Sequence, residues 1–336
     1  MILVPNCNNL SVGIVGTGVY LPETVLTNAE LEKTVDTSDE WIRSRSGICE
    51  RRIINEGEAT SDIACRAARM AVQDAGISLQ EVDAIVVATV TPDMLFPSTA
   101  CLVQNGLGLN RVAAFDVGAG CSGFVYAMGI GSQFIKTGMY NTVLVIGAES
   151  LSRIINWQDR NTCVLFGDGA GAAVLRPVPE GFGILSLDLG ADGSGADLLK
   201  LPAGGSRMPV THENCCSTDH YLNMSGREVF KFAVKIIGES ALNALEKAGL
   251  DKKDVDCFIP HQANIRIIEA AVRRLNLPMD KVFVNVQKYG NTSAASIPVA
   301  VHEAVAEGRI KRGDIVVLVG FGAGLTWGAS VIKWAK

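Results

Sequence analysis

The sequence has no excess of basic residues and few charged residues of either sign. Lys and Arg together number 30 against 35 Asp and Glu, which gives a formal net charge of −5. We therefore expect no nucleic-acid partner, although a local basic patch is compatible with this balance. Charged residues make up 19% of the chain and apolar residues 48%, a composition that excludes an intrinsically disordered protein.

The cysteines form none of the patterns that are typical of disulfide frameworks or zinc sites. Their number, nine, is odd, no two have the spacing Cys-x-x-Cys, and Cys215 and Cys216 are adjacent. We therefore expect reduced thiols, a cytoplasmic location and no metal site. Most of these cysteines should be small buried hydrophobic residues.

Three uncharged segments are long enough to be compared with membrane-spanning helices. Residues 1–22 have no basic start and are interrupted by Pro5. Residues 117–135 contain five glycines and directly follow Asp116, which favours a buried central helix. The glycines of residues 315–332 predict a strand, a tight turn and a second strand. We expect a soluble protein without a membrane partner.

The chain alternates between short runs rich in β-branched residues and segments with helical spacing. Its 336 residues include 35 glycines, which we expect at tight turns and at close backbone contacts. The alternation predicts a layered α/β protein. The expected strands are 83–90, 141–148, 171–178, 256–260 and 314–320, and the expected helices are 61–76, 124–138, 227–249 and 264–276.

The second half of the chain resembles the first. Three segments align in the same order: 71–90 with 244–263, 120–122 with 290–292, and 141–147 with 313–320. Three colinear matches make chance similarity a poor explanation, so we expect a duplicated unit. The two halves would be residues 1–180 and 181–336, which meet where Pro and Gly cluster at 178–185.

Cys121 is the cysteine whose surroundings differ from those of a packing residue. It lies among Gly118, Gly120 and Gly123, directly before an apolar helix. A helix N-terminus lowers the pKa of a thiol, so we expect Cys121 to be a nucleophile. The glycines would permit a sharp turn and leave room for a substrate. The alternative, a buried structural cysteine, is our interpretation of the other eight.

The repeat predicts two polar partners for Cys121. Asn291 occupies the position of Cys121 in the second half, and His261 follows the end of a strand. Catalytic groups of α/β sheets collect at such strand ends. A neutral His261 could move a proton or donate a hydrogen bond to an oxyanion, and the Asn291 amide could donate without changing its charge. Taken alone, His261 would be structural and Asn291 a helix cap.

Together with their flanking motifs, these residues resemble the thiolase-like condensing enzymes, most closely the β-ketoacyl-[acyl-carrier-protein] synthase III family. The resemblance implies a thiolase-like fold with two pseudo-symmetric halves in an α/β/α/β/α arrangement. The nucleophile would lie in the N-terminal half and the catalytic His and Asn in the C-terminal half. The motifs that carry it are 37–52, 96–100, 118–124, 160–172, 223–234, 260–266, 289–296 and 320–328.

The resemblance also implies a reaction. Cys121 would take the acyl group of a short-chain acyl-CoA, acetyl-CoA in the first place. Malonyl-acyl carrier protein would then lose CO2 while His261 and Asn291 stabilise its enolate, and condensation would initiate fatty-acid biosynthesis. The backbone N–H groups of Cys121 and Ala323 would form the other oxyanion hole. Acyl-CoA is a substrate, so no cofactor is expected.

Binding surfaces follow from the same resemblance. Trp41 and Arg160 would enclose the adenine of CoA, while Arg45 and Asn264 would line its channel. Phe96 would limit the acyl pocket across the interface of a homodimer. An acidic carrier protein would bind a basic patch, and ordinary solvent exposure is an equally simple interpretation of its last two members. The patch consists of Lys231, Arg266, Arg273 and Arg274.

Three alternatives remain open from the sequence. Residues 13–21 could belong to a dinucleotide-binding dehydrogenase, but Leu21 stands where the fingerprint needs its third glycine. A non-catalytic protein that senses acyl carriers would not need the Cys-His-Asn set. A related condensing enzyme of secondary metabolism would use the same residues with a different acyl starter.

Overall fold

The computed structural model describes residues 10–336, so expectations about residues 1–9, with Pro5 and Cys7, lie outside the described residues. Within this part of the chain, no helix combines the length and the apolar composition needed to cross a membrane. The four helices and five strands expected from the sequence are present. Their ends lie within two residues of the expected ones.

The first half of the chain builds a mixed five-stranded sheet. β4 (Ala84–Ala88) is parallel to both of its neighbours, β5 (Ala113–Val117) and β6 (Val143–Glu149). β7 (Gly169–Pro177) is antiparallel to β6, and β1 (Val12–Tyr20) is antiparallel to β7. The order is β1-β7-β6-β4-β5. Every residue of β4 and β6 is buried, which explains their continuous apolar sequences.

The second half builds a four-stranded sheet, β11-β12-β13-β8, whose order matches that of β4-β6-β7-β1 in the first sheet. β11 (Cys257–Pro260) is parallel to β12 (Ile315–Gly322), as β4 is to β6. β13 (Thr326–Lys333) and β8 (Gly183–Ala191) follow in antiparallel pairing, as β7 and β1 do. Residues 315–332 are therefore a strand, a turn and a strand, as expected. This correspondence supports the repeat, while a boundary at residue 180 stays a prediction.

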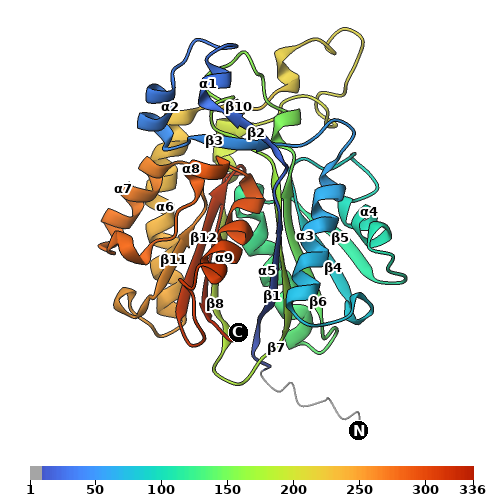
Figure 1. Ribbon diagram of the computed structural model, residues 1–336, viewed down its shortest axis with the longest axis vertical. Helices are drawn as coiled ribbons and strands as arrows, with labels where there is room; N and C mark the ends of the chain where they lie inside the picture. The colour runs from blue at the N-terminus through green and yellow to red at the C-terminus, as the bar shows by residue number, and fades with distance from the viewer. Residues whose placement is uncertain (1–9) are drawn as a thin grey trace.

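Two helices lie between the sheets, α5 (Gly123–Lys136) and α9 (Ser296–Ala306) (Figure 1). Side chains of both helices, such as Phe124 and Ile297, share one apolar core with strands of both sheets. α5 is thus covered on opposite sides by protein. Burial between the two sheets explains why residues 117–135 carry no charge, and no membrane-spanning role is needed.

Four further helices cover the outer faces of the sheets. α3 (Thr60–Asp74) and α4 (Thr99–Gly106) pack on the first sheet, while α6 (Gly226–Lys247) and α7 (Ile265–Leu275) pack on the second (Figure 1). The apolar face of α3 meets the sheet and its charged face is turned outward, as in an amphipathic helix. The expected α/β/α/β/α arrangement is confirmed.

The glycines of β1 serve helix packing. Cβ atoms at Gly16 and Gly18 would lie 2.3 Å from the carbonyl oxygens of Ala71 and Ala67 on α3, so only glycine permits this approach. The segment is a strand throughout, whereas a dinucleotide fingerprint needs a loop that opens a helix. The dehydrogenase interpretation is therefore wrong.

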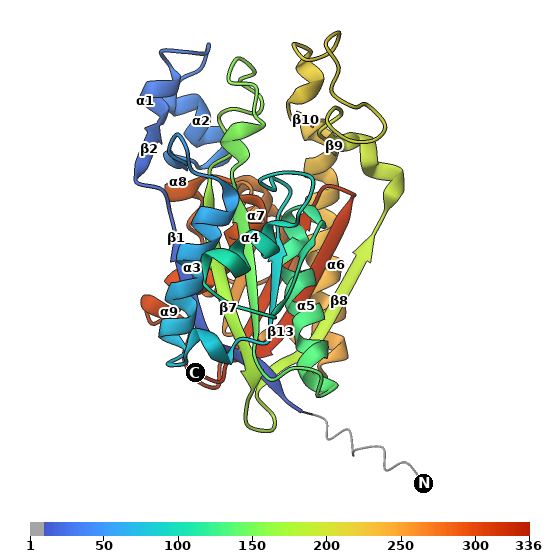
Figure 2. The same cartoon turned by 90° about the vertical axis from the view of Figure 1, so that its right-hand side faces the viewer.

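The remaining elements gather at the end of the molecule where β4, β6, β11 and β12 terminate (Figure 2). Catalytic and binding groups of α/β sheets are found at such an end. These elements are β2 (Thr24–Thr27), α1 (Asn28–Leu31), α2 (Asp39–Ser46), β3 (Glu50–Ile53), β9 (Leu199–Lys200), β10 (Asn223–Met224) and α8 (Val286–Tyr289).

Gly18→Ala should lower the free energy of unfolding by about 1–3 kcal/mol, because the added methyl group forces β1 and α3 apart. Urea denaturation monitored by circular dichroism measures this change. Gly205→Ala is the matched control, since a Cβ at Gly205 meets no atom within 4 Å. Equal losses in the two variants would contradict the packing role of Gly18.

Candidate active site

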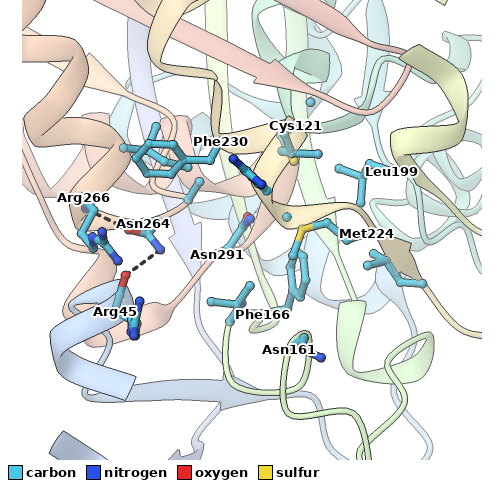
Figure 3. A pocket seen from close by; sticks show the side chains of 18 of the residues that line it. Arg45, Cys121, Asn161, Phe166, Leu199, Met224, Phe230, Asn264, Arg266 and Asn291 are labelled. Carbon is cyan, nitrogen blue, oxygen red and sulfur yellow. Dashed lines mark hydrogen bonds between the residues drawn. The ribbon is translucent and has the colours of Figure 1, made fainter. Parts of the chain in front are cut away.

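A cavity of about 930 Å³ opens at the end of the sheets where the strand ends collect. Cys121, His261 and Asn291 all line it, although they come from different halves of the chain. Figure 3 shows Cys121 and Asn291 directed into this cavity. The other expected site residues that line it are Trp41, Arg45, Lys231, Asn264 and Arg266.

Cys121 lies in a single 3₁₀ turn, Gly120–Ser122, between β5 and α5. Gly120 has φ +53°, and a Cβ there would lie 2.8 Å from the backbone nitrogen of Ala323. A Cβ at Gly123 would lie 3.0 Å from that of Ala88. Gly120 and Gly123 therefore permit close contacts, whereas Gly118 has no neighbour that would exclude a side chain.

The expected direction of the Cys121 pKa shift is wrong. Cys121 is 8% exposed, and burial raises the pKa of its thiol to about 12. The low-polarity surroundings disfavour the thiolate by more than the hydrogen bonds at the turn favour it. The resting residue is consequently a thiol.

His261 is fixed through both its backbone and its ring. It directly follows β11, and its backbone N–H donates to the carbonyl oxygen of Val319 at 2.7 Å. The ring Nδ1 lies 2.6 Å from Ser296 Oγ, and the ring meets Phe321 edge-on at 5.3 Å between centroids. Burial lowers the pKa of His261 to about 3, so the imidazole is neutral at physiological pH.

The backbone of Asn291, in the second half of the chain, is hydrogen-bonded to the first half. Its N–H donates to the carbonyl oxygen of Leu165 at 2.8 Å, and its carbonyl oxygen accepts from Gly167 N at 3.1 Å. Within its own loop, the side-chain Oδ1 accepts from Ser293 N at 2.8 Å. This bond defines the orientation of the amide, because the accepting atom must be the oxygen. The Nδ2 hydrogens are left to donate into the cavity.

The end of β12, at Gly322, and the loop that follows it lie against the Cys121 turn. A Cβ at Gly322 would lie 2.5 Å from the Cys121 nitrogen, so a side chain at that position would collide with the turn. Ala323 is not among the described non-glycine residues with positive φ, which are Arg111, Asn276 and Ser293. Alanine therefore occupies this loop without backbone strain.

Trp41 and Arg160 are in contact with each other. The Arg160 guanidinium lies 5.3 Å from the centroid of the Trp41 ring, and its Nη1 donates to the carbonyl oxygen of Asp36 at 2.8 Å. Trp41 lines the cavity, as do Asp159 and Asn161 on either side of Arg160. A flat ligand between the two side chains would have to displace the guanidinium.

Asn264 connects α2 to α7 beside the cavity. It is the N-cap of α7, where its Oδ1 accepts from Arg266 N at 2.8 Å, and its Nδ2 donates to the Arg45 carbonyl oxygen at 3.0 Å. Figure 3 shows these three residues grouped on one side of the cavity. Both polar ends of the Asn264 side chain are thus engaged in holding the cavity wall.

Besides Arg160 and Ala323, three expected site residues do not line the cavity. Phe96 is 84% exposed and is next to Leu95, which is 78% exposed. Arg273 and Arg274 lie in the last turn of α7, where Arg274 is 3.8 Å from a carboxylate oxygen of Glu239. Lys231 on α6 and the nearby Arg266 line the cavity itself. The four basic residues are therefore divided between the cavity and the adjoining helix face.

Sequence reasoning missed two residues that position the site. Ser296 contacts the His261 ring at 2.6 Å, and its only signal was its place at the end of the motif 289–296. Glu149 is a fully buried carboxylate at the end of β6, and burial raises its pKa. It accepts from Thr91 Oγ1 at 2.7 Å and from Val90 N at 3.1 Å, which holds the neighbouring strand end.

The reactive groups of the cavity are a thiol, an imidazole and an amide. Across residues 10–336, no three His, Cys, Asp or Glu side chains are arranged to hold a metal ion. A cysteine at a helix start can form a covalent thioester, and uncharged N–H donors can stabilise a developing oxyanion. The arrangement is therefore suited to acyl transfer.

Two family models match this chain, one in each half. Residues 115–193 match the model of 3-oxoacyl-[acyl-carrier-protein] synthase III, and residues 245–334 match the model of its C-terminal part. A β-ketoacyl-[acyl-carrier-protein] synthase III of Caldanaerobacter subterraneus subsp. tengcongensis is 59% identical over 98% of this chain and 100% of its own. A Desulfitobacterium hafniense protein of the same name is 57% identical over 97% of this chain and 99% of its own.

Solved structures agree with this placement. The 3-oxoacyl-[acyl-carrier-protein] synthase III of Aquifex aeolicus is 52% identical, with a TM-score of 0.89, over 96% of this chain and 100% of its own. The priming β-ketosynthase of the R1128 polyketide pathway has a similar TM-score, 0.90, over 98% of this chain and 97% of its own. It is only 33% identical.

Alkylation of Cys121 by iodoacetamide should accelerate about tenfold per pH unit from pH 7 to pH 10, because only the thiolate reacts and its pKa is raised by burial. Mass spectrometry of the peptide that contains Cys121 measures the rate, and the exposed Cys101 reports on the reagent in the same sample. A rate that levels off below pH 8 would instead indicate that the helix N-terminus lowers the pKa.

Proposed function

Because the chain belongs to the 3-oxoacyl-[acyl-carrier-protein] synthase III family, we propose that it condenses a short-chain acyl-CoA with malonyl-acyl carrier protein and so initiates fatty-acid biosynthesis. The observation that carries this proposal is the convergence of Cys121, His261 and Asn291 on one cavity. Identities of 52–59% to synthases of this name, against 33% to the polyketide enzyme, favour this function over secondary metabolism.

In the first half-reaction, Cys121 Sγ attacks the thioester carbonyl of the acyl-CoA. The bond from the acyl carbon to the CoA sulfur breaks, and the proton of the Cys121 thiol ends on that sulfur. The N–H groups of Cys121 and Ala323 donate to the oxyanion that forms between these events. Fixed donors in a buried site stabilise such an oxyanion without reorganisation.

In the second half-reaction, the malonyl group loses its carboxylate as CO2 and the freed electron pair becomes a thioester enolate. His261 and Asn291 donate to the enolate oxygen, and both residues remain uncharged. The enolate carbon then attacks the acyl carbonyl on Cys121, and the sulfur leaves and regains a proton. A neutral donor pair suits this step, because the negative charge exists only transiently.

Ser296 is the residue that sets the His261 ring for this role. Its Oγ lies 2.6 Å from Nδ1 and also 3.4 Å from the backbone nitrogen of Gln262. Donation from Nε2 to the enolate requires that Nδ1 carry no proton, and the Ser296 hydroxyl, which can donate one hydrogen bond, then donates to Nδ1. The ring proton then lies on Nε2, the nitrogen that must donate to the enolate.

The binding of CoA rests on Trp41, Arg45, Arg160 and Asn264. Arg160 would leave its contact with Trp41 to admit the adenine and would then cover the other face of the base. Arg45 and Asn264 form the wall along which the pantetheine chain reaches Cys121. No cofactor is needed, because the thioester substrates supply the activated carbon.

The protein partners are an acidic carrier protein and a second copy of this chain. Lys231 and Arg266 in the cavity, with Arg273 and Arg274 beyond it, form the basic surface for the carrier. The adjacent exposed side chains Leu95 and Phe96 would be covered in a homodimer, and Phe96 would then reach the acyl pocket of the other copy. Such an enzyme, with reduced thiols, would act in the cytoplasm.

Incubation with acetyl-CoA should add one acetyl group to the wild-type protein, detected by intact-mass spectrometry. Cys121→Ala should abolish the adduct, because it removes the nucleophile.

His261→Ala should be acylated at a rate close to that of the wild type, yet its rate of malonyl-acyl carrier protein decarboxylation should fall by about 100-fold or more. An adduct on Cys121→Ala, or equal loss of both half-reactions in His261→Ala, would contradict these roles.

Ser296→Ala should slow condensation by about 10-fold to 100-fold, the effect of one lost hydrogen bond to a buried group, with acylation nearly unchanged. Ser296→Thr keeps a hydroxyl and should recover most of the rate. Ser132→Ala is the control, since Ser132 is an equally buried serine whose hydroxyl bonds only within α5, to the Gly129 carbonyl oxygen and the Gln133 side chain. If Ser296→Ala slows both half-reactions alike, Ser296 has a purely structural role.

A further inference from the structure

The segment between β9 and β10 carries two cysteines that the condensation does not use. This segment, residues 201–222, projects from the end of the molecule that contains the cavity (Figure 2). A hydrogen bond joins its two ends, from Ala203 N to the Asp219 carbonyl oxygen at 2.9 Å. A second bond, from Leu222 N to the Ile154 carbonyl oxygen at 2.8 Å, connects the segment to the rest of the protein. Cys215 and Cys216 lie between these anchor points.

The two thiols are exposed and close to each other. Cys215 Sγ and Cys216 Sγ are 3.9 Å apart, and neither cysteine forms a disulfide. Their side chains therefore lie on the same side of the chain. Both sulfurs can reach one small ligand without a change of the fold.

Asn214 holds the turn that presents these thiols. Its Oδ1 accepts from Thr211 N at 2.8 Å, and its carbonyl oxygen accepts from Ser217 N at 2.9 Å. The His220 ring Nε2 lies 2.9 Å from the same carbonyl oxygen. The turn is thus braced on both sides of the cysteine pair, which reduces the entropy lost when both sulfurs bind one atom.

Direct oxidation of the pair is disfavoured by the chain itself. Adjacent Cα atoms are about 3.8 Å apart across a trans peptide, whereas disulfides need roughly 4.4–6.8 Å. A disulfide between neighbours is therefore strained and easily reduced. Three-ligand metal binding is also disfavoured, because no third His, Cys, Asp or Glu within residues 10–336 completes a metal-binding group with these thiols.

We propose that Cys215 and Cys216 form a bidentate site for trivalent arsenicals, a class of soft ligand that needs two sulfur atoms. An organoarsenic oxide loses its oxygen as water, which carries away the two thiol protons, and two arsenic–sulfur bonds form. Arsenic stays trivalent, so no oxidant or reductant takes part. After the first bond forms, the second thiol is already in place, and such intramolecular binding strengthens attachment by roughly 10²–10⁴-fold.

Phenylarsine oxide is the probe, added in equimolar amount to the full-length protein and followed by intact-mass spectrometry. The expected product is one adduct, heavier by the reagent less one water, that resists excess glutathione and is removed by dithiothreitol. In Cys215→Ser and in Cys216→Ser, the adduct should be lost to glutathione on the order of 100-fold faster, because only one sulfur remains.

Two variants serve as controls for this experiment. Cys101→Ser removes another exposed cysteine and should keep the glutathione-resistant adduct. Cys121→Ala should also keep it, which separates this site from the proposed condensation chemistry. A resistant adduct that persists in both Cys215→Ser and Cys216→Ser would overturn the proposal. So would a wild-type adduct that glutathione removes, or a wild-type protein that reacts only after reduction.

Discussion

The site depends on a close backbone contact between the two halves of the chain. The end of β12 approaches the Cys121 turn so closely that a Cβ at Gly322 would lie 2.5 Å from the Cys121 nitrogen. A second such contact joins β6 to the segment after Asn291, where a Cβ at Gly147 would lie 2.2 Å from the carbonyl oxygen of Ala294. These contacts bring the second half, with His261 and Asn291, onto the same cavity as Cys121. Any side chain at these glycines would separate the halves.

Burial has opposite effects on the two titratable groups of the site, and the result is a neutral site. It raises the pKa of Cys121 to about 12 and lowers that of His261 to about 3. Both groups thus avoid carrying a charge that the surroundings would not solvate. Charge then appears only when a substrate reacts, which is the situation in which fixed hydrogen-bond donors contribute most to catalysis.

Much of the fold could be predicted from the sequence, because the patterns that indicate helices and strands are local. Periodicity places β4, β6, β11 and β12 within two residues of their observed ends, and the predicted duplication agrees with the strand order that β4-β6-β7-β1 and β11-β12-β13-β8 share. The glycine pattern of β1 was ambiguous, because close helix packing and nucleotide binding both need glycine. Contact with α3 resolves that ambiguity, and a single strand cannot reveal which partner it will meet.

The sequence by itself singled out Cys121, His261 and Asn291, which line one cavity, since their types and their places in the repeat carry the information. Tertiary structure alone decided the raised pKa of Cys121, because a pKa depends on how much water the fold removes from around the thiol. It also decided the role of Ser296, whose contact with His261 spans 35 residues of sequence. Such contacts depend on the packing of α9 against β11, which no local pattern encodes.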